Sequence, residues 1–249
     1  MANYCSNRLR ISGDPVRIAE LAARIIRPDP KRPSEMLFDF DGILPVPEGL
    51  GDVLPCNRYE TGWAQLDDGV LVKNTEETIG PVLYGRLKEE SVARQFDWNT
   101  LTVGHINRYL QDKPELQKRL GLKPEAAKQV LLNVGRYGEP DCWTWRLHRR
   151  GCLWDAQDCQ VEVSDGLIDV FFYTDWSPPE GVYAAVCAAY PDLTLRAEYL
   201  EENEAVAGSF ANSGTTLSDY PCSDEAYRAF AAEHFGCEVL DDDEDNTDD

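Results

Sequence analysis

The chain has 249 residues, 43% of them hydrophobic, so it is long enough for one large domain or for a domain that carries a sizeable insertion. Its net charge of −21 repels nucleic acid and anionic membranes over the molecule as a whole. No apolar run approaches the roughly 20 residues of a membrane span, and the eight cysteines lack a Cys-x-x-Cys spacing, so we expect a cytoplasmic protein with reduced thiols and no membrane association.

The N-terminal segment predicts a strand followed by a helix. Residues 4–12 alternate around Leu9 and Ile11 and end at a Gly-Asp-Pro turn. Asp14 is a suitable N-cap and Pro15 suits the first helical position. An apolar stripe at helical spacing then runs through residues 16–26, before a group of prolines ends the helix.

The pattern becomes irregular and rich in turn residues over 27–157, which we interpret as an insertion. Helices are predicted within it at residues 100–110 and 124–134. Near its start, Asp39 and Asp41 lie two residues apart and would share one face of a strand, where a divalent cation could bind. The alternative, which we favour, is a strand end that runs into the turn at Gly42.

After the insertion the pattern sharpens. Residues 158–163 and 167–173 are β-rich runs separated by Ser-Asp-Gly, which predicts a hairpin. A helix is expected next, with Ser177 as its N-cap and a buried face from Val182 to Tyr190. Residues 192–199 and 205–210 predict further strands, and residues 223–235 predict a last helix.

In chain order these elements predict an α+β fold of the ferredoxin-like type, a split β-α-β-β-α-β sheet with a long insertion after the first helix. We expect one domain over residues 1–237, with its core in 4–26 and 158–210. Residues 238–249 hold eight acids and no base, which predicts a disordered acidic tail. The tail serves either as a solubilising segment or as a mimic of a phosphate backbone.

The most distinctive segment, residues 143–150, interleaves indole rings with basic side chains. Such groups bind anions or stack on bases, and the stretch from Arg108 to Arg150 is net +5 in a strongly acidic chain. The alternative is that the tryptophans anchor the insertion on the sheet and the arginines pair with carboxylates. In this alternative, Trp176 packs as a hydrophobic plug at the start of the helix that follows it. The candidate binding residues are Trp143, Trp145, Arg146, His148, Arg149, Arg150, Trp154 and Trp176.

Three blocks resemble the YubB-like ferredoxin-fold domain family. They are the opening Ala2–Gly13, the segment Leu153–Ala156, and Phe172–Pro179. The resemblance covers about two fifths of the chain; it implies the ferredoxin-like fold and an origin in a phage, plasmid or other mobile element. It supplies no catalytic residues.

We therefore expect a non-enzymatic mobile-element protein that acts by binding a host or element-encoded protein. One role that such binding would serve is to blunt a host defence system. The alternative is a nucleic-acid-associated module that uses the Trp/Arg surface. A second alternative is an enzyme of unrecognised type, although the three histidines stand outside any nucleophile motif. No catalytic residue, metal ligand or cofactor is assigned.

Overall fold

The structure is a computed structural model that describes residues 3–51 and 62–237. The chain divides into two compact units, Met1–Val46 with Arg146–Asp249, and Pro47–Trp145. We call them the sheet unit and the helical unit. The predicted disordered tail, residues 238–249, lies outside the described residues.

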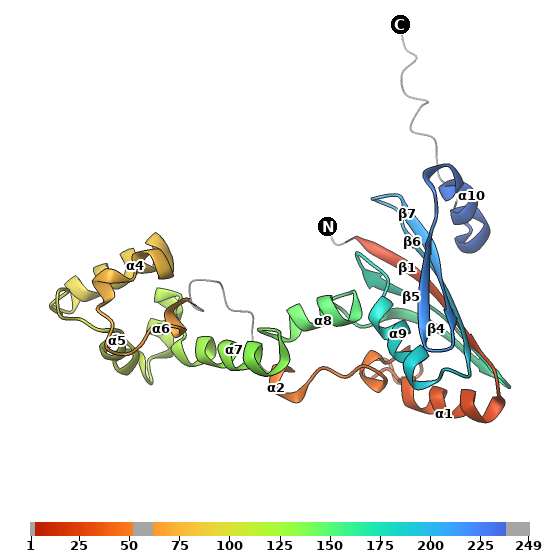
Figure 1. The fold of residues 1–249 in the computed structure, drawn as a ribbon, viewed down its shortest axis with the longest axis horizontal. Coiled ribbons are helices and arrows are strands. Elements are labelled where there is room, and N and C mark those ends of the chain that lie inside the picture. Colours follow the sequence, from red (N-terminus) through yellow and green to blue (C-terminus); the bar gives the residue numbers. More distant parts are fainter. Residues whose placement is uncertain (1–2, 52–61, 238–249) are drawn as a thin grey trace, which may run out of the picture. The chain divides into compact units, whose positions relative to one another are not determined.

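The sheet unit contains an antiparallel sheet of order β4-β5-β1-β6-β7-β8 (Figure 1). Its first four strands have the arrangement expected of a ferredoxin-like fold, and the predicted α+β class is confirmed. The strands are β1 (Tyr4–Ser12), β4 (Gln157–Ser164), β5 (Leu167–Asp175), β6 (Thr194–Glu201), β7 (Val206–Ser213) and β8 (Thr216–Pro221). A separate pair joins β2 (Ile26–Pro28) to β3 (Met36–Phe38), and the short 3-10 helix η1 (Phe40–Gly42) follows.

Helices cover both faces of this sheet. Helices α1 (Pro15–Ile25) and α9 (Glu180–Ala189) pack on the face that carries Leu9 and Phe172, where they form the main hydrophobic core. Helix α10 (Asp224–Phe235) packs on the opposite face against Leu200 and Ala207. The alternation of side chains along β6 explains this division, because Leu200 and its neighbour Tyr199 point to opposite faces.

Two of the three caps and turns predicted from local sequence form as expected. Asp14 caps α1, because its carboxylate accepts hydrogen bonds from the backbone N–H groups of Val16 and Arg17 at 3.0 and 3.2 Å. The hairpin between β4 and β5 turns at Gly166, whose φ of +81° favours glycine. The prediction that Ser177 caps α9 is wrong. The helix begins at Glu180, and the Ser177 hydroxyl donates instead to the carbonyl of Gly151.

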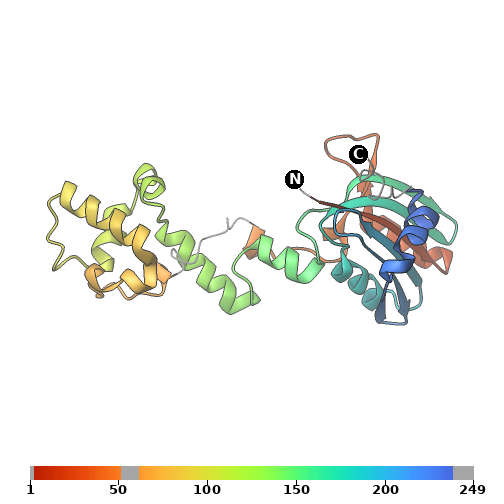
Figure 2. The same ribbon diagram turned by 90° about the horizontal axis from the view of Figure 1, so that it is seen from above.

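The helical unit is built from helices and their connecting loops (Figure 2). It has its own apolar core. The core joins side chains of α4, α5 and α6, among them Leu87, Ile106 and Leu120. The predicted helix at 100–110 begins at Val103, and the one predicted at 124–134 extends to Tyr137. The elements are α2 (Glu48–Gly51), η2 (Val72–Asn74), α4 (Glu76–Ala93), α5 (Val103–Leu110), α6 (Pro114–Leu120) and α7 (Pro124–Tyr137). Helix α8 (Cys142–Arg150) begins in this unit and ends in the sheet unit.

A buried carboxylate ties α4 to α5 and α6. Glu90 accepts hydrogen bonds from the Tyr109 hydroxyl at 2.9 Å and from Arg94 at 3.1 Å, and it pairs with Arg119. Burial acts to raise the pKa of Glu90, but these hydrogen bonds and the charge of Arg119 outweigh it, so the pKa lies below its ordinary value. The ionised form of Glu90 is therefore more favourable in the folded protein than in the unfolded chain.

This carboxylate gives a prediction about pH. A depressed carboxyl pKa stabilises the fold above the unfolded pKa of about 4.3, and the contribution is lost as the pH falls through the folded pKa. We expect Glu90→Gln to lower the free energy of unfolding at pH 7 and to have a smaller effect at about pH 3, measured by urea denaturation. The control is Glu89→Gln at the exposed neighbouring position. An equal loss at both pH values would contradict the assignment.

Candidate binding surface

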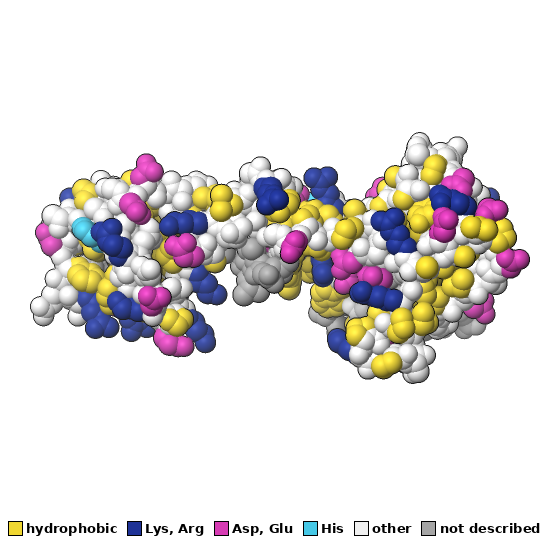
Figure 3. All heavy atoms as spheres, turned by 90° about the horizontal axis from the view of Figure 1, so that it is seen from below, with side chains coloured by type: hydrophobic (Ala, Val, Ile, Leu, Met, Phe, Trp, Pro, Cys, Tyr) yellow, Lys and Arg dark blue, Asp and Glu magenta, His cyan; other side chains and the backbone are white. Residues whose placement is uncertain are grey.

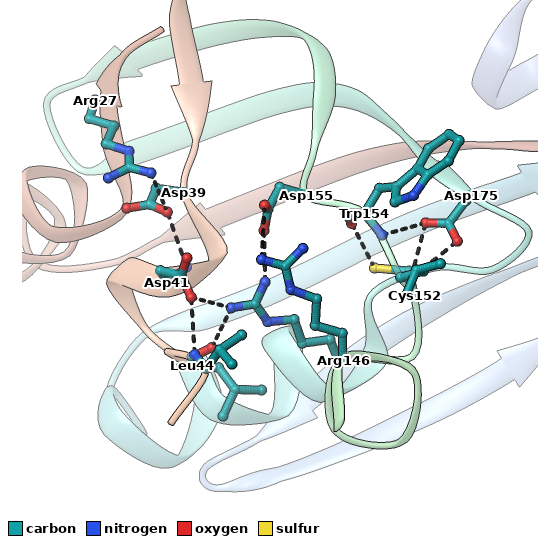
Figure 4. A network of polar contacts seen from close by, with 12 residues as sticks. Arg27, Asp39, Asp41, Leu44, Arg146, Cys152, Trp154, Asp155 and Asp175 are labelled. Carbon is teal, nitrogen blue, oxygen red and sulfur yellow. Dashed lines mark hydrogen bonds and ion pairs between the residues drawn. The ribbon is translucent and has the colours of Figure 1, made fainter. Parts of the chain in front are cut away.

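A buried arginine lies where α8 ends in the sheet unit. The Arg150 side chain is 0% exposed, although it carries a full charge. Its Nη1 donates to Asp155 at 2.7 Å, and its Nη2 donates to the Leu44 carbonyl at 2.8 Å and to Asp41. The guanidinium therefore joins the end of α8 to Asp155 in the loop that follows it and to the segment of Asp41 and Leu44, which lie 109 and 106 residues away in the chain. Figure 4 shows the positions of Asp41, Leu44 and Asp155.

The two aspartates near η1 are held by different partners. Asp39 accepts from the backbone N–H of Asp41 at 3.1 Å and pairs with Arg27, whereas Asp41 pairs with Arg150 (Figure 4). Burial raises the pKa of Asp39, and the charge of Arg27 opposes this. The favoured interpretation, a strand end that runs into the turn at Gly42, is confirmed, because β3 ends at Phe38 and Asp39 caps the 3-10 turn. The two carboxylates therefore do not share one face of a strand.

A second buried carboxylate fixes the loop after α8. Asp175, the last residue of β5, accepts hydrogen bonds from the backbone N–H groups of Leu153 at 3.1 Å and Trp154 at 2.7 Å. In Figure 4 the Trp154 ring extends away from these polar contacts. A buried carboxylate that accepts two backbone N–H groups holds a loop firmly, because each lost bond would leave a polar group unsatisfied.

Two glycines allow these segments to approach one another. Gly151 has a φ of +92°, and a Cβ there would lie 2.8 Å from the carbonyl oxygen of Pro178. A Cβ on Gly181 would lie 1.7 Å from the carbonyl oxygen of Arg149. The first turn of α9 thus packs directly on the backbone of the last turn of α8. We call the region formed by residues 146–156 and 174–181 the junction.

The junction presents large apolar side chains to solvent. Leu147, Trp154 and Trp176 are 53%, 39% and 57% exposed. Trp176 also has a φ of +63°, which is uncommon for a bulky residue and needs surrounding contacts to hold it. One such contact is the hydrogen bond from its N–H to the carbonyl of Asn3 at 2.9 Å. The expectation that Trp176 plugs the entrance to α9 is wrong, since its ring lies at the surface.

The structure places six of the eight candidate residues at the junction. Arg146, with its guanidinium 3.8 Å from Asp155, is half-buried, whereas His148 and Arg149 are exposed. Trp143 and Trp145 belong to the helical unit, where Trp143 is exposed and Trp145 is buried. Trp145 and Arg150 are thus buried, whereas Trp154 and Trp176 are exposed, and binding by these residues stays a prediction.

Sequence reasoning did not find the residues that support this surface. They are Asp41, Asp155, Asp175, Gly151 and Gly181. The one available signal was the glycine that follows a basic helical end, which is typical of a helix C-terminus. Asp41 and Asp175 carried no local signal, since Arg150 and the N–H groups of Leu153 and Trp154, which they bind, are far away in the chain.

The thiol at the junction is inert. Cys152 is buried, and its Sγ lies 3.4 Å from the carbonyl oxygen of Trp154. Burial raises the pKa of the Cys152 thiol well above its ordinary value, and it raises that of Cys5 to about 12.

Among residues 3–51 and 62–237, no group of three or more His, Cys, Asp or Glu side chains could hold a metal ion. None of the helices in those ranges has the length and apolar character of a membrane crossing.

Part of the sheet unit is similar to a known family of domains. Residues 153–245 match the family described as the ferredoxin-like domain in Api92-like protein. The matched part includes Trp154, Asp175 and Trp176 and begins after α8. A crystal structure of a protein api92 from Yersinia pseudotuberculosis is similar to this chain with 13% identity and a TM-score of 0.40, over 90% of this chain and 99% of that one. No curated protein matches the chain.

Proposed function

We propose that the chain is a non-enzymatic, cytoplasmic protein of a mobile element such as a phage or plasmid. It acts by binding a host or element-encoded protein at the junction, and its role is to blunt a host defence system. The mobile-element origin rests on the resemblance of three sequence blocks to the YubB-like family. The observation that carries the binding role is the exposure of Trp154 and Trp176 on a rigid support.

The chemistry of the junction suits protein recognition. Tryptophan and arginine are enriched among the residues that dominate binding energy at protein interfaces. Here two indoles, Leu147 and Arg149 are all exposed within the junction. The loop that carries Trp154 is already ordered by Asp175, so binding would lose little conformational entropy.

The charged groups beneath the surface have structural partners. Arg150 and Asp175 are buried and engaged by backbone groups, and Arg150 also pairs with two carboxylates. We therefore assign these charges to support of the surface. The net charge of −21 favours the approach of a partner with a basic surface, and the indoles would then enter an apolar pocket on it.

Removing the two exposed indoles tests the proposal. We expect the double variant Trp154→Ala/Trp176→Ala to bind its partner about 30-fold more weakly, since truncating a residue central to an interface costs about 2 kcal/mol. The measurement is a quantitative pull-down from host cells, followed by titration of the purified partner. Both side chains are exposed, so the thermal midpoint should shift little.

The matched control is Trp143→Ala, which removes an equally exposed indole from the helical unit. A protein captured by the wild type and by Trp143→Ala, but not by the double variant, supports the proposal. Equal capture by all three chains would overturn it.

A further inference from the structure

Two successive helices of the helical unit are joined by a tight turn. Helix α6 ends at Leu120, and α7 begins at Pro124 after only three residues. Gly121 has a φ of +70°, and the N–H of Leu122 donates to the carbonyl of Gln117 at 3.0 Å. This is the Schellman arrangement, which ends one helix sharply and redirects the chain. Proline at the first position of α7 starts the next helix at once.

The turn is fixed by apolar packing, and α7 buries one of its faces. Leu120 and Leu122 are buried in the core of the helical unit together with residues of α4 and α5. Helix α7 buries one face, at Pro124, Ala127, Val130 and Asn133. These positions recur every three residues, so a single stripe of α7 faces inward. Two helices joined by a three-residue turn that contains glycine, with the second helix amphipathic, make up a helix-turn-helix.

The opposite face of α7 is exposed and carries basic and apolar side chains. Lys128, Leu132 and Arg136 are spaced four residues apart and therefore lie along one side of the helix. Lys128 lies 3.4 Å from Glu125 in an exposed ion pair, a contact that contributes little. Leu132 is 66% exposed. An exposed leucine flanked by two cations suits a groove with apolar and anionic groups.

The charge around the motif is opposite to that of the whole chain. From Arg108 to Arg136 there are seven basic and three acidic residues, a net charge of +4 in a chain of −21. All seven basic side chains are exposed. Figure 3 shows Lys and Arg side chains at the surface of the helical unit, several of them close together at its lower edge in that view. The basic residues are Arg108, Lys113, Lys118, Arg119, Lys123, Lys128 and Arg136.

We infer that α6 and α7 form a helix-turn-helix that binds duplex DNA, with α7 in the major groove. The major groove is about 12 Å wide and admits an α-helix. Lys128 can donate to a guanine edge, and Leu132 can contact a thymine methyl group. The basic side chains that flank the turn would bind phosphates and set the register. This surface belongs to the helical unit and does not depend on the junction.

The test is binding of the full chain to a fluorescently labelled 40-base-pair duplex of mixed sequence, measured by anisotropy at about 50 mM salt. We expect salt-sensitive binding, and we expect Lys128→Glu to weaken it about tenfold, the effect of losing one phosphate or base contact at this salt concentration. Lys31→Glu is the matched control, because it makes the same charge change at an exposed position of the sheet unit.

A second variant, Arg136→Glu, should weaken binding in the same direction and reduce the slope of log K against log salt by about 1. Three results would overturn the inference. They are absence of duplex binding by the wild type, an equal loss in Lys31→Glu and Lys128→Glu, and a single strand of the same sequence binding as tightly as the duplex.

Discussion

We expect Gly181→Ala to lower the temperature at which the sheet unit unfolds. The new Cβ would lie 1.7 Å from the carbonyl oxygen of Arg149, which is backbone and has no alternative rotamer. The first turn of α9 would have to move away from the end of α8. Overpacking of this kind costs about 3 kcal/mol, which corresponds to a fall of roughly 6–12 °C in the thermal midpoint.

The control for this variant is another glycine in a helix. Gly85 lies within α4, and a Cβ there would meet no atom within 4 Å. Gly85→Ala should raise stability by up to about 1 kcal/mol, because alanine is the better helix former. Calorimetry on both variants gives the comparison. If Gly181→Ala melts at the wild-type temperature, then α8 and α9 do not pack as closely as described.

The second large effect is expected at Arg150. Arg150→Met keeps most of the side-chain volume but removes the donors to Asp41, Asp155 and the Leu44 carbonyl. Loss of one member of a buried ion pair costs about 3–5 kcal/mol. We expect about 3 kcal/mol, because Asp41 and Asp155 are partly exposed and stay hydrated after the change.

Two further variants, Arg150→Lys and Arg149→Met, distinguish the effect of the charge of Arg150 from the effect of its geometry. Arg150→Lys should recover part of the loss, since an ammonium group keeps the charge but cannot span both carboxylates. Arg149→Met, at the exposed adjacent position, should change the free energy of unfolding by less than about 0.5 kcal/mol. Urea denaturation measures all three variants. An Arg150→Met variant as stable as Arg149→Met would show that the buried guanidinium does not hold the junction together.

Features of the fold that depend on neighbouring residues were predictable from the sequence. The cap at Asp14 and the hairpin turn at Gly166 need only a few adjacent residues, and both formed as predicted. Alternation along the central strands gave the order of elements in the ferredoxin-like sheet. Strand β8 was not predicted, because its residues are largely exposed and show no apolar alternation.

The junction was only partly predictable because its geometry depends on contacts between distant residues. The indoles and arginines stood out by type, but their orientation is set by partners far along the chain. Arg150 is buried by Asp41, 109 residues away, and Trp154 is oriented by Asp175, 21 residues away. Trp176 lies at the surface, and its backbone takes a positive φ, which no local propensity indicates for tryptophan.

The residues of the helix-turn-helix, in contrast to those of the junction, lie close together in the sequence. Its defining residues, Leu120, Gly121 and Leu122, are adjacent in the sequence, and α7 was predicted with nearly the observed bounds. The motif became evident only when the φ of Gly121 and the inward stripe of α7 were known. Exposure then distinguished the outer face of α7 from the buried one.

Site-specific photocrosslinking in cells that express the chain tests the proposed function. The crosslinking residue p-benzoylphenylalanine replaces Trp154, Trp176 or, as a control, Trp143, and each of these side chains is exposed. If the junction binds a protein, we expect positions 154 and 176 to crosslink to one and the same protein and position 143 not to crosslink to it. No discrete product from 154 and 176, or the same product from all three positions, would contradict the proposal that the junction is a protein-binding surface.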